Sequence, residues 1–307
     1  MKKIFILMLI VFLSFSIGIV ESQGVEKIFF YSNRAVYPST SNYHIWMMNP
    51  DGTGLEQVTF GNVYDVRPEL SPDGTKIVFY RYIPPDWDCP SIWVRNLITG
   101  VETKITADEC PSFSSYFPTW SPDGKKIAFN RSATYVPGTA RIWIVDVSDF
   151  PNVGVPYQLS PSSGASRLWG SWSPDETNIL YSHEVGGYAP LTIYKIDVAT
   201  GIEQQVIPYV RGEYEPRYSP DGTKFAWTTF RHSNEGDVYI ADVANPVGTQ
   251  RRLTPFSPFQ NPAWSPDGSK IVLFGYNGFD IWVINADGTG FTQLTSGPAF
   301  DKDFAHD

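Results

Sequence analysis

The sequence predicts an all-β fold, namely a six-bladed β-propeller with four strands in each blade. The tetrapeptide Ser-Pro-Asp-Gly, or a close variant, occurs five times, with starts 46 to 52 residues apart. Each copy is followed by a run of β-branched and aromatic residues, which is typical of strands. Self-similarity at this period indicates a repeat architecture, and four-stranded repeats arranged in a ring form propellers. The copies begin at Ser71, Ser121, Ser173, Ser219 and Ser265.

The tetrapeptide is interpreted as the turn between the first two strands of a unit. Proline presets φ at the second position of the turn, and glycine accepts the left-handed conformation that closes it. The copy at Ser173 departs from this pattern, because Glu176 stands at the glycine position. Glutamate is strained in a left-handed conformation. We therefore expect this turn to shift and to use Asn178 or another geometry.

Each complete unit is expected to contain four strands. In the second unit they cover residues 67–70, 76–80, 91–95 and 102–106. The first three strands of the later units cover residues 117–120, 126–129 and 141–146 in the third, 170–172, 178–181 and 191–197 in the fourth, 215–218, 224–227 and 237–242 in the fifth, and 261–264, 270–274 and 280–284 in the sixth.

The first unit is incomplete at its start. Residues 27–31, 44–48 and 55–59 supply three strands, but no first strand precedes them. At the other end of the chain, residues 303–307 align with the first strand of the sixth unit, residues 261–265. We expect this C-terminal strand to complete the first blade, because closing the ring removes exposed sheet edges. Residues 23–307 would then form one domain.

The N-terminus has the features of an export signal. Lys2 and Lys3 precede an unbroken apolar run over residues 4–20, which a polar stretch follows. We expect residues 1–22 to be a signal peptide, with cleavage after Ser22. The run is also close to the length of a membrane-spanning helix, so an uncleaved anchor is the alternative. In either case the rest of the chain would be exported, to the periplasm or the cell exterior.

Composition and cysteine content narrow the class of protein further. The formal net charge is −9, which disfavours binding to a nucleic-acid backbone. The two cysteines, Cys89 and Cys110, both lie in the second unit. In an exported protein such a pair is first interpreted as a disulfide, and the sequence lacks the Cys-x-x-Cys spacing of a redox-active pair.

Residues 264–272 and 280–288 resemble the WD-like repeats of the TolB-type β-propeller family. The resemblance extends over essentially the whole chain after the leader and implies the propeller fold. TolB itself carries an additional α/β domain before its propeller, whereas here the first unit follows the leader almost directly. Propellers of the prolyl oligopeptidase family are also similar, but they are joined to a hydrolase domain with a Gly-x-Ser-x-Gly motif, which this sequence does not contain.

One set of candidate binding residues precedes the proline-like position in each first strand. Pseudo-symmetry places these residues around one mouth of the central channel, where aromatic and charged side chains suit a sugar, a peptide or a small polar ligand. The alternative is that they pack and seal the channel. The set comprises Arg67, Phe117, Trp169, Glu215, Asn261 and Asp303.

A second set follows the second strands. Arg81, Arg131 and His183 occupy equivalent positions in adjacent units, and Arg34, Arg231 and His232 lie near that position in theirs. Convergent arginines would bind an anion or a uronic acid, since guanidinium forms two hydrogen bonds with a carboxylate. The alternative is a structural role that recurs with the repeat.

Metal binding is not expected. His183, His232 and His306 could form a site of the kind that oligogalacturonate lyases use, but these residues would project from different depths. Asp86, Asp88, Asp108 and Glu109 surround the cysteines without the spacing of a calcium loop.

The sequence shows no complete catalytic constellation, so we expect no catalytic residues and no cofactor. The leading hypothesis is an exported, monomeric, non-catalytic propeller that binds a protein or a cell-envelope component. Binding would use the long-loop face, which carries the loops between second and third strands and the connections between blades. The alternative is a carbohydrate-binding protein or a polysaccharide-lyase-like enzyme, with a glycan as its ligand. No nucleic acid is expected as a partner, and the membrane only through an uncleaved leader.

Overall fold

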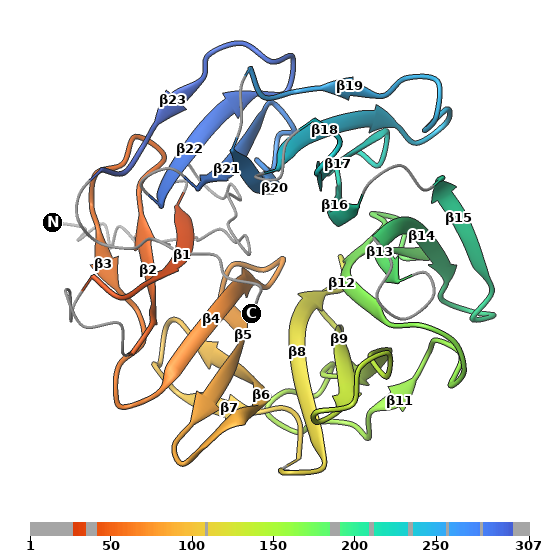
Figure 1. Ribbon diagram of the computed structural model, residues 1–307. Helices are drawn as coiled ribbons and strands as arrows, with labels where there is room; N and C mark the ends of the chain where they lie inside the picture. The colour runs from red at the N-terminus through yellow and green to blue at the C-terminus, as the bar shows by residue number, and fades with distance from the viewer. Residues whose placement is uncertain are drawn as a thin grey trace, which may run out of the picture.

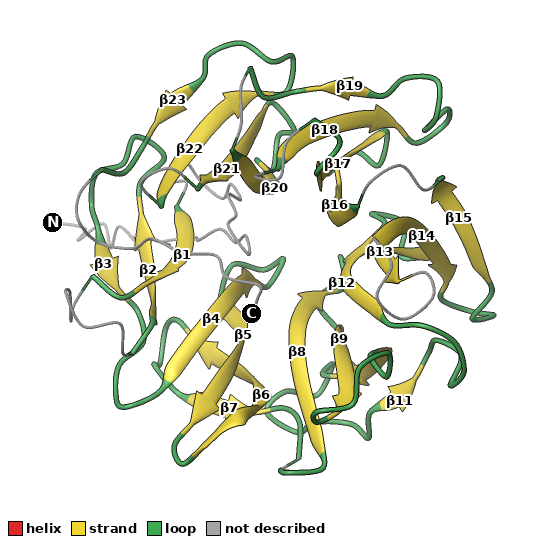
Figure 2. Ribbon diagram, in the orientation of Figure 1, coloured by secondary structure: helices red, strands yellow, loops and turns green. Residues whose placement is uncertain are grey.

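The computed structural model describes residues 27–34, 42–107, 110–184, 191–208, 212–232, 236–255, 258–276 and 279–296. Over these residues the chain forms six antiparallel sheets that stand around a central axis as the blades of a propeller (Figure 1). The predicted fold class is confirmed. The described part of the chain is built only of strands, turns and loops (Figure 2). None of it forms a helix with the length and apolar character needed to cross a membrane.

Within each blade the strands pair in chain order, and the first strand of every complete blade lies nearest the axis (Figure 1). The first blade contains β1 (Ile28–Ser32), β2 (His44–Met48) and β3 (Glu56–Gln57); the second contains β4 (Tyr64–Leu70), β5 (Lys76–Ile83), β6 (Asp86–Asn96) and β7 (Glu102–Lys104); the third contains β8 (Phe113–Trp120), β9 (Lys126–Ala133), β10 (Arg141–Asp146) and β11 (Tyr157–Gln158). The fourth contains β12 (Arg167–Trp172), β13 (Asn178–Glu184), β14 (Leu191–Asp197) and β15 (Glu203–Ile207); the fifth contains β16 (Glu213–Tyr218), β17 (Lys224–Thr229), β18 (Asp237–Asp242) and β19 (Arg251–Arg252); the sixth contains β20 (Phe259–Trp264), β21 (Lys270–Gly275), β22 (Asp280–Asn285) and β23 (Thr292–Gln293).

The first blade joins the ring through its side chains. One continuous apolar cluster contains Ile28 and Phe29 from the first blade, Ile77 from the second and Val272 and Phe274 from the sixth. Burial of this cluster therefore links both ends of the described chain. Residues 303–307, which were predicted to supply the missing strand of the first blade, lie outside the described residues.

Antiparallel pairing separates the connections into two faces. The turn face carries the Ser-Pro-Asp-Gly turns and the connections between third and fourth strands. The loop face carries the connections between second and third strands and those between successive blades. The candidate residues that follow the second strands, Arg81, Arg131 and His183, lie towards the loop face.

All five Ser-Pro-Asp-Gly turns share one hydrogen-bond network. In the second blade the Ser71 hydroxyl donates to Asp73, the Lys76 backbone N–H donates to the Ser71 hydroxyl, and the Gly74 N–H donates to the Ser71 carbonyl at 2.8 Å. Equivalent bonds form in the other four copies. The turn therefore satisfies its own buried polar groups at every repeat.

The prediction that the fourth-blade turn shifts is wrong. Glu176 adopts the glycine-like conformation with φ of 60°, and its N–H donates to the Ser173 carbonyl at 2.9 Å as glycine does elsewhere. The Glu176 carboxylate also accepts a hydrogen bond from the Asp123 backbone N–H at 2.7 Å, across the blade boundary. Strain of about 1–2 kcal/mol for a left-handed residue is thus held in place by the turn network and by a contact with the third blade.

A break in strand pairing recurs in the innermost strand of each complete blade. The register of the first two strands shifts at the same place in all five. One residue at each shift has φ between 52° and 57°, which is rare for residues other than glycine. These five residues are Arg67, Phe117, Trp169, Glu215 and Asn261.

In the fourth, fifth and sixth blades, a side chain of the preceding blade accepts the backbone N–H that the bulge frees. The N–H of Trp169 donates to Asn130 Oδ1 at 3.0 Å, and that of Asn261 donates to Thr228 Oγ1 at 2.9 Å. Glu215 makes the same contact with Ser182 Oγ at 3.1 Å. These three bulges thus link neighbouring blades through hydrogen bonds.

Candidate functional site

The five bulge residues occupy equivalent positions in the innermost strands, and we call them the channel ring. Arg67 and Glu215 come from the second and fifth blades, which face each other across the six-bladed ring. Their side chains meet, with Arg67 Nη2 donating to Glu215 Oε1 at 2.7 Å. Both are buried, with 2% and 6% of their side chains exposed. A buried ion pair therefore spans the channel.

Aromatic side chains fill the rest of the channel ring on one side. The Arg67 guanidinium lies 5.2 Å from the centre of the Phe117 ring, which in turn lies 5.2 Å from the Trp169 ring. Trp169 also contacts Tyr214, at 5.6 Å between ring centres. These contacts and the burial of Arg67, Trp169 and Glu215 favour the interpretation that the channel ring packs and seals the channel. Asp303, the sixth predicted member, lies outside the described residues.

On the loop side of the channel ring, aromatic side chains are only half buried. They include Tyr64, Tyr82, Tyr116, Tyr214 and Phe230, which we call the aromatic rim. Tyr64 and Tyr82 are paired across β4 and β5, and edge-to-face contacts link Tyr116 to Phe117 and Tyr214 to Phe230. Burial raises the pKa of Tyr82 to about 12, so its hydroxyl remains protonated and able to donate a hydrogen bond.

Sequence reasoning missed the aromatic rim. Tyr116 and Tyr214 each directly precede a channel-ring residue, so the same alignment of units that located the ring could have found them. The chain contains 17 tyrosines, but most are strand residues, and composition alone did not separate those on the rim from those in the blades.

The predicted anion-binding set does not converge. Arg81 is buried within the second blade, where its guanidinium donates to Asp65 at 2.5 and 2.8 Å and to Glu102 at 2.6 Å. It also lies between two aromatic rings, at 5.1 Å from Phe79 and 4.9 Å from Trp93. Every one of these contacts is inside its own blade.

Arg131 and His183 follow the same rule in the third and fourth blades. The Arg131 guanidinium lies 5.0 Å from the Phe113 ring and 4.8 Å from the Trp143 ring. His183 stacks on Tyr194 with 4.5 Å between ring centres. Burial, together with nearby Arg167, lowers the pKa of His183, so its imidazole is neutral near pH 7.

The positions near this set repeat the arrangement. Arg34 lies over Trp46, and Arg231 lies over Tyr239, which His232 also contacts through a hydrogen bond of 2.6 Å. A cationic or imidazole side chain thus covers the third-strand aromatic ring in each of the first five blades, a structural role that recurs with the repeat. Among the described residues, no group of three or more His, Cys, Asp or Glu side chains is placed to hold a metal ion. His306 lies outside them.

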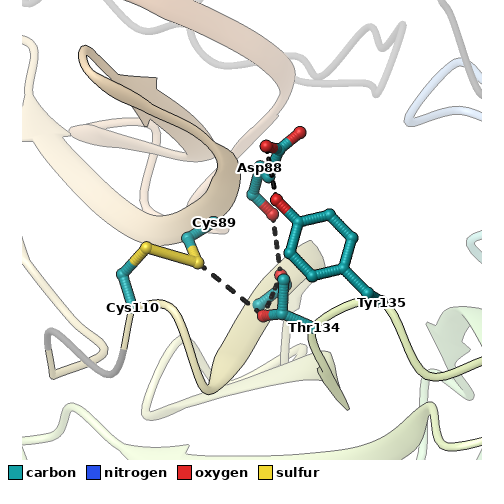
Figure 3. The surroundings of a disulfide bond; sticks show 6 residues. Asp88, Cys89, Cys110, Thr134 and Tyr135 are labelled. Atoms are coloured by element: carbon teal, nitrogen blue, oxygen red, sulfur yellow. Dashed lines mark hydrogen bonds between the residues drawn. A yellow bond between two sulfur atoms is a disulfide. The ribbon is translucent and has the colours of Figure 1, made fainter.

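The predicted disulfide joins Cys89, in β6, to Cys110, with 5.6 Å between their Cα atoms (Figure 3). Side chains of the third blade form hydrogen bonds with Asp88, the residue before Cys89. Tyr135 donates to the Asp88 carboxylate at 2.5 Å, and Ser114 donates to the Asp88 carbonyl at 3.1 Å. These hydrogen bonds hold the loop-face ends of the second and third blades together, beside a disulfide that ties β6 to the connection between β7 and β8.

Four apolar side chains are exposed around this point. Ile83 ends β5, Phe113 begins β8, and Tyr135 and Val136 follow β9, all on the loop face. Their exposed fractions are 38%, 44%, 75% and 51%. We call these four residues the crest. Clustered exposed apolar side chains are a feature of interaction sites, whereas single ones are ordinary.

The family model described as the TolB beta propeller domain matches residues 22–215, well over half of the chain. The chain belongs to the TolB β-propeller family. A second model, for the N-terminal region of dipeptidyl peptidase IV, matches residues 219–305.

The alignments of this TolB-family chain with its sequence relatives extend over only part of the chain. An uncharacterized protein of Agrobacterium fabrum is 26% identical in an alignment 199 residues long, with coverage of 52% of this chain and 65% of the relative. The Tol-Pal system protein TolB of Anaeromyxobacter dehalogenans is 36% identical over 92 residues, 28% of this chain and 20% of that protein. The chain therefore spans less than two thirds of the length of these curated relatives.

Solved structures share the fold. TolB from Acinetobacter baumannii superposes with a TM-score of 0.70 at 23% identity, covering 90% of this chain and 65% of that one. An oligogalacturonate lyase in complex with manganese gives a TM-score of 0.59 at 17% identity, covering 87% and 73%. At such identities the likeness concerns the fold alone.

Proposed function

We propose that this protein is an exported, non-catalytic β-propeller that binds a protein or another cell-envelope component through its loop face. The proposal places one domain, residues 23–307, after a leader of residues 1–22. It rests on membership of the TolB β-propeller family and on the export-signal features of residues 1–22. The observation that carries it is the crest, four exposed apolar side chains at the loop-face ends of the second and third blades, which the Tyr135–Asp88 hydrogen bond links beside the Cys89–Cys110 disulfide.

The crest has the composition of a protein contact surface. Aromatic residues contribute most to binding energy at protein interfaces, and Phe113 and Tyr135 are the aromatic members of the crest. Covalent and hydrogen-bonded support lowers the entropy that binding would otherwise cost. The predicted anion-binding residues, in contrast, are engaged within their blades, which weighs against an enzyme built on Arg81, Arg131 and His183.

The direct test is a pull-down from the native envelope with the wild-type protein and with a Phe113→Ser, Tyr135→Ser variant. We expect the variant to lose most of the captured partner, with a melting temperature lowered only by the loss of the Tyr135–Asp88 hydrogen bond and of the Phe113 contact with Arg131. An Ile98→Ser, Val155→Ser variant is the matched control, because Ile98 and Val155 are 76% and 89% exposed on the turn face. Equal capture by all three proteins would contradict a role for the crest.

Export is tested separately by determining the N-terminus of the mature protein after expression in its native envelope. A protein that begins at Gln23 supports cleavage after Ser22. Retention of residues 1–22 in a membrane fraction supports the anchor, and a full-length protein in the cytosol would contradict export.

A second candidate function, glycan binding, is favoured by the aromatic rim. Half-buried tyrosine rings with protonated hydroxyl groups can stack against sugar rings and donate hydrogen bonds to them. A glycan array with the wild-type protein and a Tyr116→Ala, Tyr214→Ala variant tests it. Robust glycan binding that the variant loses, without any captured protein, would replace the first proposal.

A further inference from the structure

The turn face holds a groove that the proposed function does not use. It lies between the second and third blades and has a volume of about 250 Å³. This is room for about eight water molecules, and it approaches the size of a small-ligand site. Three segments line it: residues 71–76 before and at the start of β5, residues 120–125 between β8 and β9, and residues 147–150 after β10.

The groove lies at a turn whose sequence differs from the other four copies. In four of the five turns the residue after the turn is threonine or serine, and its hydroxyl donates to the turn aspartate. In the third blade Lys125 stands at this position. Asp123 therefore receives no such hydroxyl and is paired with the Lys125 ammonium at 3.4 Å instead.

A second departure supplies an apolar wall. The connection from β10 to β11 covers residues 147–156, whereas its counterpart in the second blade covers only 97–101. The longer connection brings Phe150 to the groove, beside the buried side chains of Trp120 and Val147. The turn itself requires neither Lys125 nor Phe150, because the other copies form without them.

The groove carries two ion pairs, one from each blade. Lys76 Nζ lies 3.0 Å from Asp73 Oδ2 and 6.0 Å from the centre of the Phe150 ring. The pair of Lys125 and Asp123 is longer, and 64% of the Lys125 side chain is exposed. An exposed ion pair of this length contributes little to stability, so its two members can exchange partners at small cost.

We propose that this groove binds a small zwitterion with an apolar substituent, of which an α-amino acid is the simplest example. The ligand carboxylate pairs with Lys125, its ammonium group pairs with Asp123, and its side chain packs on Phe150. A ligand with a single charge would separate the pair and leave one member without a partner, whereas a zwitterion satisfies both. This inference is independent of the proposed function, because the groove lies on the face opposite the crest.

Titration calorimetry on the intact protein tests the inference with three probes that differ only in charge. L-phenylalanine is the zwitterion, phenethylamine lacks the carboxylate, and 3-phenylpropionate lacks the ammonium group. We expect saturable binding of L-phenylalanine, at least tenfold tighter than binding of either analogue. The absence of saturable heat with L-phenylalanine, or equal affinity for all three probes, would overturn the assignment.

Variants locate the site. Lys125→Thr restores the residue type of the other turns and should fold normally, yet it should weaken L-phenylalanine binding at least tenfold. Phe150→Ser should do the same by removing the apolar wall. Thr223→Lys, at the equivalent position of the fifth blade, is the matched control and should leave affinity unchanged. Wild-type affinity in Lys125→Thr at an unchanged melting temperature would sink the proposal.

Discussion

The two faces of the propeller differ in how they use the repeat. On the turn face, five blades form the same Ser-Pro-Asp-Gly network, and even Glu176 takes the conformation of the glycine that it replaces. On the loop face, the described residues include features found in one place, such as the Cys89–Cys110 disulfide and the crest. The difference teaches that regular positions build the ring, and that specificity is expected where a blade departs from the others.

The largest effect is expected where the series of turns is interrupted, at the first blade. Deletion of residues 302–307 should lower the melting temperature by more than about 10 °C, if these residues supply the missing strand. The physical reason is that β1 (Ile28–Ser32) is fully buried and would lose its partner on the channel side. Thermal unfolding followed by circular dichroism measures this, and an unchanged melting curve would show that the ring does not depend on a C-terminal strand.

The next largest loss of stability is expected in the channel ring, which lies between the two faces. Replacing Arg67 by Met leaves the buried carboxylate of Glu215 without its partner, which should cost about 3–5 kcal/mol of unfolding free energy. The double variant Arg67→Met, Glu215→Leu removes both charges and should regain at least half of that loss. Chemical denaturation measures both. A single variant as stable as the wild type would mean that the pair does not span a sealed channel.

The disulfide tests whether the loop face depends on a local support. Cys89→Ser, Cys110→Ser should lower the free energy of unfolding by about 3 kcal/mol, as the loop-closure estimate gives for a link over a sequence separation of 21. It should also weaken partner capture by the crest. Reduction of the wild-type protein with dithiothreitol should reproduce the loss, and a variant with wild-type stability and capture would contradict this role.

The smallest effect is expected from any single turn, because the turn network is shared among five copies. Although burial alone would raise their pKa values, hydrogen bonds from Ser71 and Thr75 hold the pKa of Asp73 at about 2, and those from Ser121 and Lys125 hold the pKa of Asp123 at about 2. A carboxyl whose folded-state pKa lies below its ordinary value stabilises the protein above that ordinary value, near 4. The contribution is lost as pH falls through the folded-state pKa.

The melting temperature should therefore fall between about pH 4 and pH 2. Asp73→Asn should flatten this fall by only a few degrees, because Asp73 is 55% exposed and four other turns remain. Glu56→Gln, at an exposed residue of β3 outside the turns, is the control. A complete loss of acid sensitivity in Asp73→Asn would show that one turn, and not the series, carries it.

Much of the fold could be predicted because each unit has turn residues and a strand pattern that a few neighbouring residues determine. The spacing of the Ser-Pro-Asp-Gly turns located the strands that follow them, and alignment of the units placed Arg67, Phe117, Trp169, Glu215 and Asn261 at one level of the channel. Cys89 and Cys110 could be paired because they are the two cysteines of the sequence and follow an export signal. The inferences about strands and channel need only the period and the pairing rules of strands.

The candidate sites were less accessible to prediction. Equivalent positions showed that Arg81, Arg131 and His183 were related, but not that each would be bound inside its own blade by partners such as Asp65 or Tyr194. The crest depends on which side chains remain exposed after the second and third blades pack together. The turn-face groove depends on Lys125 and Phe150, which are distant in sequence from Asp73 and Lys76 and meet them only across a blade boundary.

By itself, the sequence determined the number of blades, the order of the strands and the face on which each connection lies, because turn chemistry and strand alternation act over a few residues. Only the tertiary structure decided that Arg67 reaches Glu215 across the channel, and that Glu176 keeps the turn geometry by accepting a bond from Asp123. Both outcomes depend on distances between blades. Those distances are set by the packing of the whole ring, and no local pattern encodes them.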